Sequence, residues 1–199
     1  MSVELQESVL VVPRTVIDPL CHAVFTPEVA PVEKAVLANC QFLARNIAET
    51  DYKFKQVIPY VVVRHEDRTL LIWRTNKQTE ARLHNLYSLG VGGHINDTDV
   101  PSTSSNIILT GMRREFNEEI AVEGEQSCEL VGIINDDSTD VSRVHMGFVF
   151  VLRTSSPRFT IMEPGKYTAA WKTSQELSTH HAQMETWAQI VCDHVIRSR

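Results

Sequence analysis

The sequence contains only four cysteines, at positions 21, 40, 128 and 192, and no C-x-x-C pair. This spacing argues against a zinc ribbon or a dithiol redox motif, and we expect reduced, buried thiols typical of a cytosolic protein. The eight histidines include no H-E-x-x-H or similar metal-binding spacing. The chain therefore lacks the sequence signatures of a zinc enzyme and of a disulfide-rich secreted domain.

A long apolar run and an excess of positive charge are also missing. No apolar stretch reaches the roughly 18 residues that span a membrane. Glu4 and Glu7 precede the first short apolar run, which is the wrong order for a signal peptide. The formal net charge is −6, which gives no electrostatic footprint for nucleic acid. We therefore predict a cytoplasmic protein that binds neither a membrane nor nucleic acid.

The most informative stretch runs from residue 92 to residue 122. Near its end, Glu115, Glu118 and Glu119 place three carboxylates within five residues. On a helix, positions three and four apart are neighbours, so Glu115 lies beside both of the others. Three like charges repel, and the commonest chemical reason to keep them together is a hard divalent cation such as Mg²⁺. The alternative is a solvated helix face with one Arg114–Glu118 pair.

The same residues are predicted to be helical without considering the acids. An apolar residue recurs at every fourth position, at Ile108, Met112, Phe116 and Ile120. Ser104 and Ser105 are the candidate N-caps. At about 100° per residue, the carboxylates lie beside this apolar stripe and not opposite it. We therefore expect the acids at the edge of the buried face, where a cleft can form.

The run Arg114-Glu115-Phe116-Asn117-Glu118-Glu119 resembles the R-E-U-x-E-E core of the Nudix hydrolase box, in which U is apolar. The full box of the family is G-x5-E-x7-R-E-U-x-E-E-x-G-U. Gly92-Gly93-His94-Ile95 is similar to the strand end that opens it. The resemblance covers about 30 residues in the box, and the flanking pattern fits the family fold over about residues 56 to 195.

Three departures from the box concern its loop and its end. Twenty residues separate Gly93 from Arg114, where the family has 13, and we assign the seven extra residues to 97–103. Counting back from Arg114, the first Glu of the box falls at Asn106, so that acid is missing or is replaced from the loop. Ala121 stands in place of the late glycine, at a cost of about 1 kcal/mol if φ is positive there. Gly124 is the candidate to provide the turn instead.

The resemblance implies an α+β fold, a Nudix-like α/β/α sandwich with a mixed β-sheet and an N-terminal extension. It also implies a Mg²⁺- or Mn²⁺-dependent hydrolase that cleaves a phosphoanhydride bond in a nucleoside diphosphate linked to another group. The metal ligands would be Glu115, Glu118, Glu119 and a backbone carbonyl at Gly93, or at Gly92 if the register slips. Arg114 would orient the helix acids.

A general base and a phosphate-binding group complete the expected site. Glu119 or Glu163 would take the proton from water, with Asp137 as a further loop candidate. Three cations are expected in a loop before the glycine strand and would bind the substrate phosphates: Arg74, Lys77 and Arg82. The alternative is a solvated polar loop. Trp73, Tyr87 and Phe148 are candidates either for stacking a base or for the core.

We divide the chain into an N-terminal extension, residues 1–55, packed on a hydrolase domain, residues 56–199. The extension contains a strand-prone run over 8–17 and a helical pattern over about 31–44. It could cover a sheet edge, shape the cleft or form a homodimer contact. The domain begins with a hairpin, 56–64 and 69–74, followed by strands over 86–95, 129–135, 143–152 and 159–162. A capping box at Thr173 and Glu176 and an amphipathic helix over 184–195 end it.

Two alternative functions differ in kind from this hydrolase. An isopentenyl-diphosphate isomerase-like enzyme uses a related fold and needs a reactive cysteine near the active-site strands, but no cysteine lies between residues 41 and 127. A non-catalytic Nudix-fold sensor would bind a nucleotide derivative and regulate a partner. The acidic triad argues against the sensor, and no appended DNA-binding domain is evident.

Overall fold

The computed structural model describes residues 7–75, 86–102, 106–162 and 164–197. Its contacts divide the chain into two compact units. The first unit comprises Met1–Pro59, Gly93–Arg114 and Gly132–Phe148, and the second comprises Tyr60–Gly92, Glu115–Val131 and Val149–Arg199. Four elements have residues in both units: β4 (Phe54–His65), α4 (Ile107–Glu119), β9 (Gln126–Ile134) and β10 (His145–Thr154).

The strands form a ten-stranded mixed sheet with the path β12-β5-β4-β10-β9-β2. The ends of that path are β12 (Tyr167–Thr173) and β2 (Phe25–Thr26), and β5 (Arg68–Arg74) lies next to β12. Four more strands pair with it off the path: β1 (Ser8–Pro13), β3 (Gln41–Ala44), β6 (Tyr87–Ser88) and β7 (Gly90–Val91). The predicted α+β class with a mixed sheet is confirmed.

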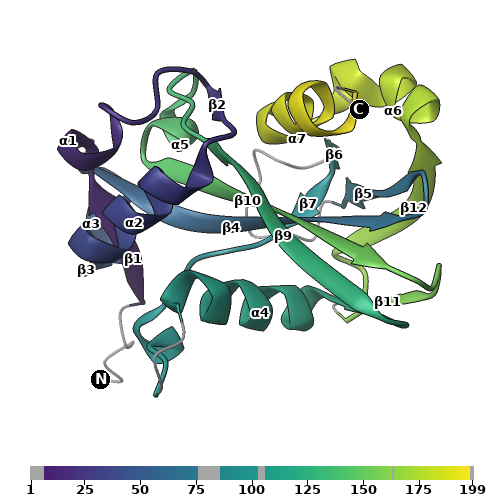
Figure 1. The fold of residues 1–199 in the computed structure, drawn as a ribbon, viewed down its shortest axis with the longest axis horizontal. Coiled ribbons are helices and arrows are strands. Elements are labelled where there is room, and N and C mark those ends of the chain that lie inside the picture. Colours follow the sequence, from purple (N-terminus) through teal and green to yellow (C-terminus); the bar gives the residue numbers. More distant parts are fainter. Residues whose placement is uncertain (1–6, 76–85, 103–105, 163, 198–199) are drawn as a thin grey trace. The chain divides into compact units, whose positions relative to one another are not determined.

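In the first unit, β1 pairs antiparallel with β3 and with the beginning of β4. Three helices belong to the same N-terminal part of the chain: α1 (Arg14–Ile17), α2 (Val29–Asn39) and α3 (Arg45–Ala48) (Figure 1). The prediction of a helix over 31–44 is wrong at its C-terminal end, because α2 ends at Asn39. Residues 41–44 form a strand because their backbone pairs with that of residues 8–11.

In the second unit, the predicted hairpin of β4 and β5 is confirmed, with Arg64 opposite Thr69. The third strand, β12, pairs with β5 along its whole length, from Tyr167 opposite Arg74 to Thr173 opposite Arg68. The single strand predicted over 86–95 is replaced by the short strands β6 and β7. A separate two-stranded sheet joins β8 (Ile120–Val122) to β11 (Phe159–Ile161).

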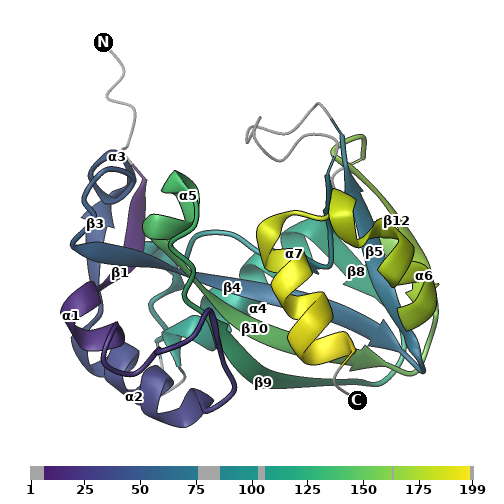
Figure 2. The ribbon, with the colours of Figure 1, turned by 90° about the horizontal axis from the view of Figure 1, so that it is seen from above.

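Two C-terminal helices, α6 (Ser174–His180) and α7 (Thr186–Val191), lie over one side of β5, β6 and β12 (Figures 1 and 2). The end of α4 lies on the other side of these strands. The capping box of Thr173 and Glu176 forms as predicted and begins α6. A 3₁₀ turn, His181–Gln183, joins the two helices, and a π-helical turn, Cys192–Ile196, follows α7. The predicted apolar positions Met184, Val191 and Val195 are buried.

Buried apolar side chains of the first unit include Leu10 and Ile108, and those of the second unit include Leu70 and Phe150. The expectation of buried thiols is right for Cys21 and Cys192, but Cys40 is half-buried and Cys128 is exposed. None of these four described cysteines forms a disulfide. Within the described ranges, no helix has the length and apolar character needed to cross a membrane.

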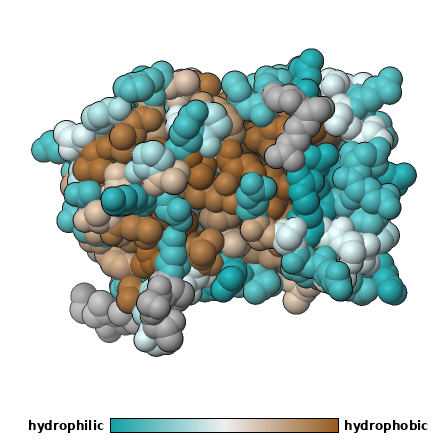
Figure 3. All heavy atoms as spheres, in the orientation of Figure 1, coloured by the Kyte–Doolittle hydropathy of each residue, from teal (hydrophilic) through white to brown (hydrophobic). Residues whose placement is uncertain are grey.

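The face drawn in Figure 3 carries apolar residues among hydrophilic ones. Large apolar side chains of the first unit that stand exposed are Val24, Leu37, Ile47, Tyr52 and Val100. Scattered apolar residues of this kind are ordinary on protein surfaces.

Candidate active site

Helix α4 forms as predicted, with Ile108, Met112 and Phe116 buried. Its cap is Asn106, whose Oδ1 accepts a hydrogen bond from the backbone N–H of Ile108 at 2.9 Å. The Asn106 amide also donates to Glu33 Oε1 at 2.6 Å. The predicted caps, residues 104 and 105, lie outside the described residues. An Asn at this position satisfies a backbone donor that the first turn leaves open.

The three glutamates occupy the last two turns of α4. Glu115 and Glu119 are half-buried, whereas Glu118 is exposed. Tyr167 Oη donates a hydrogen bond to Glu119 Oε1 at 2.5 Å. The acids therefore lie at the edge of the buried face, where the sequence pattern predicted them.

The chemistry of these side chains fits a hard cation, because carboxylate oxygens are the ligands that Mg²⁺ and Mn²⁺ prefer. Among the described residues, no three His, Cys, Asp or Glu side chains converge closely enough to hold an ion. Side chains three and four apart on a helix can converge by changing rotamer, and Mg²⁺ keeps several water ligands. The metal-binding roles of the three glutamates and of the Gly93 carbonyl remain predictions.

Arg114, one residue before the triad, forms a two-pronged ion pair with Asp99 in the first unit. Its Nε donates to Asp99 Oδ1 at 2.7 Å and its Nη2 to Oδ2 at 2.8 Å. Nη2 also donates to the carbonyl oxygen of His94 at 2.9 Å. Burial acts to raise the pKa of Asp99, but hydrogen bonds from Arg114 and from the Asn96 N–H hold it below its ordinary value. This pair fixes the turn of α4 that leads into the triad.

The position of Asp99 corrects the predicted register of the box. Asp99 is the sixth residue after Gly93, which is the G-x5-E spacing of the family. It ends a short 3₁₀ helix, Asp97–Asp99, and is only 3% exposed. Of the two alternatives for the first acid of the box, replacement from the loop is therefore the correct one: Asp99 provides the acid. The extra residues follow Asp99 and do not start at 97. Counting forward from Gly93 would have found this residue.

The second unit shows how the chain accommodates Ala121 at the position of the late box glycine. Ala121 lies in β8 and pairs with Thr160 of β11, so it needs no positive φ. Gly124 has a φ of 89°, as predicted for the residue that makes the turn. A Cβ there would lie 2.6 Å from Ser155 Oγ. Replacement of the late box glycine by Ala121 therefore costs the backbone nothing.

Of the three predicted phosphate-binding cations, only Arg74 lies within the described residues, because Lys77 and Arg82 lie outside them. Glu163, the predicted general base, also lies outside the described residues. Arg74 ends β5 and is half-buried, with its guanidinium carbon 5.7 Å from the centre of the Tyr167 ring. Burial acts to lower the pKa of Arg74, but the charges of Glu185, Tyr167, Tyr60 and Glu119 raise it above its ordinary value. Arg74 is thus a permanent cation in the electrostatic environment of Glu119.

A buried polar group in the second unit was missed from the sequence. Glu185 is 9% exposed, and its Oε1 accepts hydrogen bonds from Tyr60 Oη at 3.0 Å and Ser88 Oγ at 2.5 Å. The backbone N–H of Leu89 donates to Tyr60 Oη at 3.2 Å. Burial and the charge of Glu185 raise the pKa of Tyr60 well above its ordinary value. This network links the residue before α7 to β6 and to Leu89, which joins β6 to β7.

Asp137, the alternative loop acid, is held by two cations of the first unit. It accepts hydrogen bonds from Arg14 Nη1 at 3.1 Å and from Lys55 Nζ at 2.7 Å. Lys55 is fully buried and also donates to the carbonyl oxygens of Asp136 and Ser142. Burial acts to raise the pKa of Asp137, but the hydrogen bonds from Arg14 and Lys55 hold it below its ordinary value. A carboxylate committed to these partners is a weak candidate for a general base.

Comparison with known proteins links this arrangement to a family. No protein-family model matches the chain. It is 34% identical over 170 residues to protein YmaB of Bacillus subtilis (strain 168), covering 83% of this chain and 82% of that protein. It is 32% identical to Tm1382, a protein proposed to be a Nudix hydrolase. The crystal structure of Tm1382 matches this structure with a TM-score of 0.82, and the match covers 97% of this chain and 100% of that chain.

A more distant match shows the fold alone. The Nudix domain of Shewanella oneidensis NrtR, crystallised with ADP ribose, is 15% identical and has a TM-score of 0.53 over 70% of this chain and 84% of that chain. The match to Tm1382 is stronger because it combines sequence identity with coverage of the whole relative, N-terminal residues included. Taken with a box whose missing acid is found at Asp99, it establishes that this chain belongs to the Nudix family.

Proposed function

We propose that the chain is a metal-dependent hydrolase that cleaves the phosphoanhydride bond of a nucleoside diphosphate linked to another group. The observation that carries the proposal is the triad Glu115, Glu118 and Glu119 at the end of α4, at the edge of the buried face. The hydrogen bond from Tyr167 fixes the orientation of Glu119. A solvated helix surface does not need such a bond, whereas a metal site must keep each carboxylate oriented beside the others.

The residues divide the chemistry between them. Glu115, Glu118 and Glu119 would hold Mg²⁺ or Mn²⁺, which when bound neutralises charge on the diphosphate and acidifies the attacking water. Glu119 or Glu163 would accept the proton of that water as its oxygen attacks phosphorus. The P–O bond to the leaving phosphate then breaks, and the products are two phosphate monoesters. Arg74 would bind a phosphate oxygen, and Arg114, fixed by Asp99, would position the helix.

Replacing Glu118 or Glu119 by Gln tests this proposal. We expect metal-dependent turnover to fall by about 100-fold or more, with unchanged circular dichroism. Glu129→Gln, at an exposed glutamate of β9, is the matched control and should keep full activity. The measurement is formation of the two phosphate monoesters, separated by ion-exchange chromatography, from a panel of nucleoside diphosphate derivatives with Mg²⁺ or Mn²⁺, and again with EDTA. Equal rates in the parent and both Gln variants would refute the metal role.

ADP ribose is a suitable first compound, because it is a nucleoside diphosphate linked to a sugar. The NrtR domain binds it in a related fold. The same assay separates an enzyme from a sensor. Binding of a diphosphate derivative with no product under any metal condition would favour the non-catalytic alternative.

A further inference from the structure

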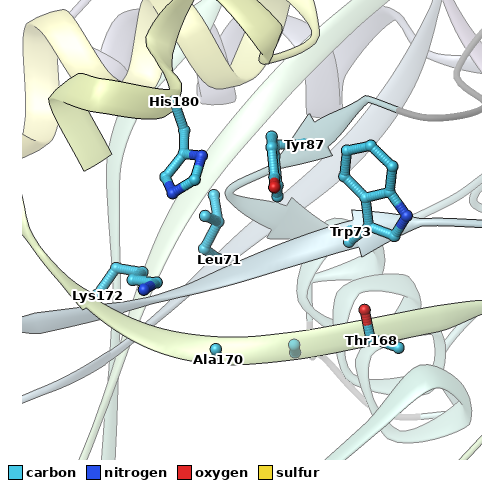
Figure 4. A pocket seen from close by; sticks show the side chains of 8 residues that line it. Leu71, Trp73, Tyr87, Thr168, Ala170, Lys172 and His180 are labelled. Carbon is cyan, nitrogen blue, oxygen red and sulfur yellow. The ribbon is translucent and has the colours of Figure 1, made fainter. Parts of the chain in front are cut away.

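A second candidate binding site lies on the side of β5 and β12 that faces α6. It is a hollow of about 440 Å³ in the second unit. Residues of β5, β6, β12 and α6 line it: Leu71, Trp73, Tyr87, Thr168, Ala169, Ala170, Lys172 and His180 (Figure 4). This volume lies within the range of small-molecule sites, about 300–1,000 Å³.

Strand alternation separates the hollow from the glutamate triad. Successive side chains of a strand point to opposite faces. In β12, Tyr167 points to α4 and contacts Glu119, so Thr168, Ala170 and Lys172 point the other way. The hollow and Glu119 therefore lie on opposite sides of the β5–β12 pair.

Three rings form one wall of the hollow. The ring centres of Trp73 and Tyr87 are 4.6 Å apart, and those of Tyr87 and His180 are also 4.6 Å apart. All three side chains are only half-buried, so part of each ring remains uncovered. The planes of Trp73 and Tyr87 are inclined at 61°, and those of Tyr87 and His180 at 56°. A planar ligand can therefore stack on the face of one ring and contact the edges of the others.

The floor of the hollow is open because β12 has small side chains there. Besides Lys172, the side chains of β12 that point to this side are those of Thr168 and Ala170, and both are small. Thr168 and Ala170 are exposed, and Figure 4 shows Thr168 below Trp73 and Ala170 below Leu71. The hollow therefore has a flat floor and an aromatic wall, a shape suited to a planar ligand.

One cation stands at the end of this space. The Lys172 ammonium donates to Glu176 Oε1 at 3.2 Å, and Glu176 is itself fixed by the Thr173 backbone N–H at 2.8 Å. The Lys172 side chain is 29% exposed. An ammonium group has three donors, so Lys172 can bind an anion while Glu176 holds it in place.

We propose that this hollow binds a nucleoside monophosphate, with the base against Trp73, Tyr87 and His180 and the phosphate on Lys172. Among the described lining residues, a single lysine matches one phosphate better than the chain of phosphates in a triphosphate. The proposal does not depend on hydrolysis by the glutamate triad. If both hold, the site would bind a product of the reaction.

Binding of AMP to the full chain in EDTA tests the proposal, measured by calorimetry and by Trp fluorescence. Tyr87→Ala should weaken AMP binding by about 10-fold or more. Lys172→Ala should weaken AMP binding and leave adenosine binding unchanged. Tyr52→Ala and Lys53→Ala, at exposed positions of the first unit, are the matched controls and should bind AMP like the parent.

Ala170→Leu gives a variant that fills the hollow at an exposed position and should fold normally. It should abolish binding of both AMP and adenosine. The proposal is overturned if the parent binds no AMP at millimolar concentration, or if Ala170→Leu binds it like the parent. It is also overturned if Glu118→Gln loses binding in EDTA, since AMP would then occupy the triad. AMP binding by a chain that hydrolyses nothing would support this site and count against the proposed hydrolase.

Discussion

Tyr167 connects the strand β12 to the chemistry proposed for α4. Its hydroxyl holds one oxygen of Glu119, and its ring lies under the Arg74 guanidinium. A hydrogen bond to a carboxylate favours the ionised form and fixes the rotamer. Tyr167 is therefore a positioning residue in the proposed reaction, although nothing in its sequence neighbourhood marks it.

Tyr167→Phe removes the hydroxyl and keeps the ring. We expect kcat to fall by about 10-fold, the loss of one hydrogen bond to a charged group, with little change in KM. The acid limb of the pH–rate profile should move to higher pH, because the ionised carboxylate loses a donor. Tyr52→Phe is the control. A variant with the parent's kcat and pH profile would assign Tyr167 to packing alone.

Asp99→Asn tests the buried ion pair with Arg114. The pKa of Asp99 is lowered in the folded protein, so its stabilising contribution is present above the ordinary Asp value, about 3.9. It is lost as the pH falls through the lower folded value. We expect the variant to lose about 2 kcal/mol of unfolding free energy at pH 7, and the difference from the parent to shrink below pH 4. Urea unfolding at pH 7, 5 and 3 measures it.

The exposed neighbour Asp97 provides the control for this experiment. Asp97→Asn should unfold at the parent's urea concentration at each pH. A difference between parent and Asp99→Asn that stays constant from pH 7 to pH 3 would show that ionisation of Asp99 is irrelevant.

Helix α4 is the element on which the proposed site depends, and its start is set by Asn106. Its apolar stripe packs into the core, while its final turns present the glutamates. The Asn106 cap and the Asp99–Arg114 pair secure this helix before the triad begins. A helix secured in this way holds its last turns in a fixed register even though three like charges repel there.

Asn106→Ala removes the cap of α4. We expect a loss of about 1 kcal/mol in unfolding free energy, measured by urea denaturation. Asn117→Ala, at an exposed position inside the same helix, is the matched control and should be neutral or slightly stabilising, because Ala is the better helix former. Equal losses in the two variants would argue against capping by Asn106.

For the chain as a whole, the structure bears on how residues 1–55 relate to the remainder. In the first unit, β1 pairs with β4 and β2 pairs with β9. The side chains of Arg14 and Lys55 both donate hydrogen bonds to Asp137. The division at residue 55 and a homodimer contact through the extension remain proposals. These pairings indicate that the extension completes the sheet.

A chain restricted to residues 56–199 should therefore fail to fold stably. It would lose the β1 and β2 pairings and the buried Lys55, leaving sheet edges that promote aggregation. Thermal unfolding by circular dichroism and size-exclusion chromatography provide the measurement. Cooperative unfolding of the truncated chain at the parent's temperature would show that residues 1–55 are a dispensable addition.

Local patterns in the sequence determined much of this protein. The apolar period predicted α4 and placed its three glutamates at the edge of the buried face. Alternation and a polar turn predicted the β4–β5 hairpin, and the Thr173–Glu176 spacing predicted the start of α6. These features depend on residues within a few positions of one another, so a single stretch of chain contains the information they need.

Contacts between distant residues were decided only by the tertiary structure. Three hydrogen-bonded pairs are far apart in the sequence. Asp99 and Arg114 are separated by 15 positions, Glu119 and Tyr167 by 48, and Lys55 and Asp137 by 82. The helical pattern before residue 44 ended early because 41–44 found a strand partner in 8–11. Which segments become neighbours depends on how the sheet is assembled, and local periodicity does not encode that choice.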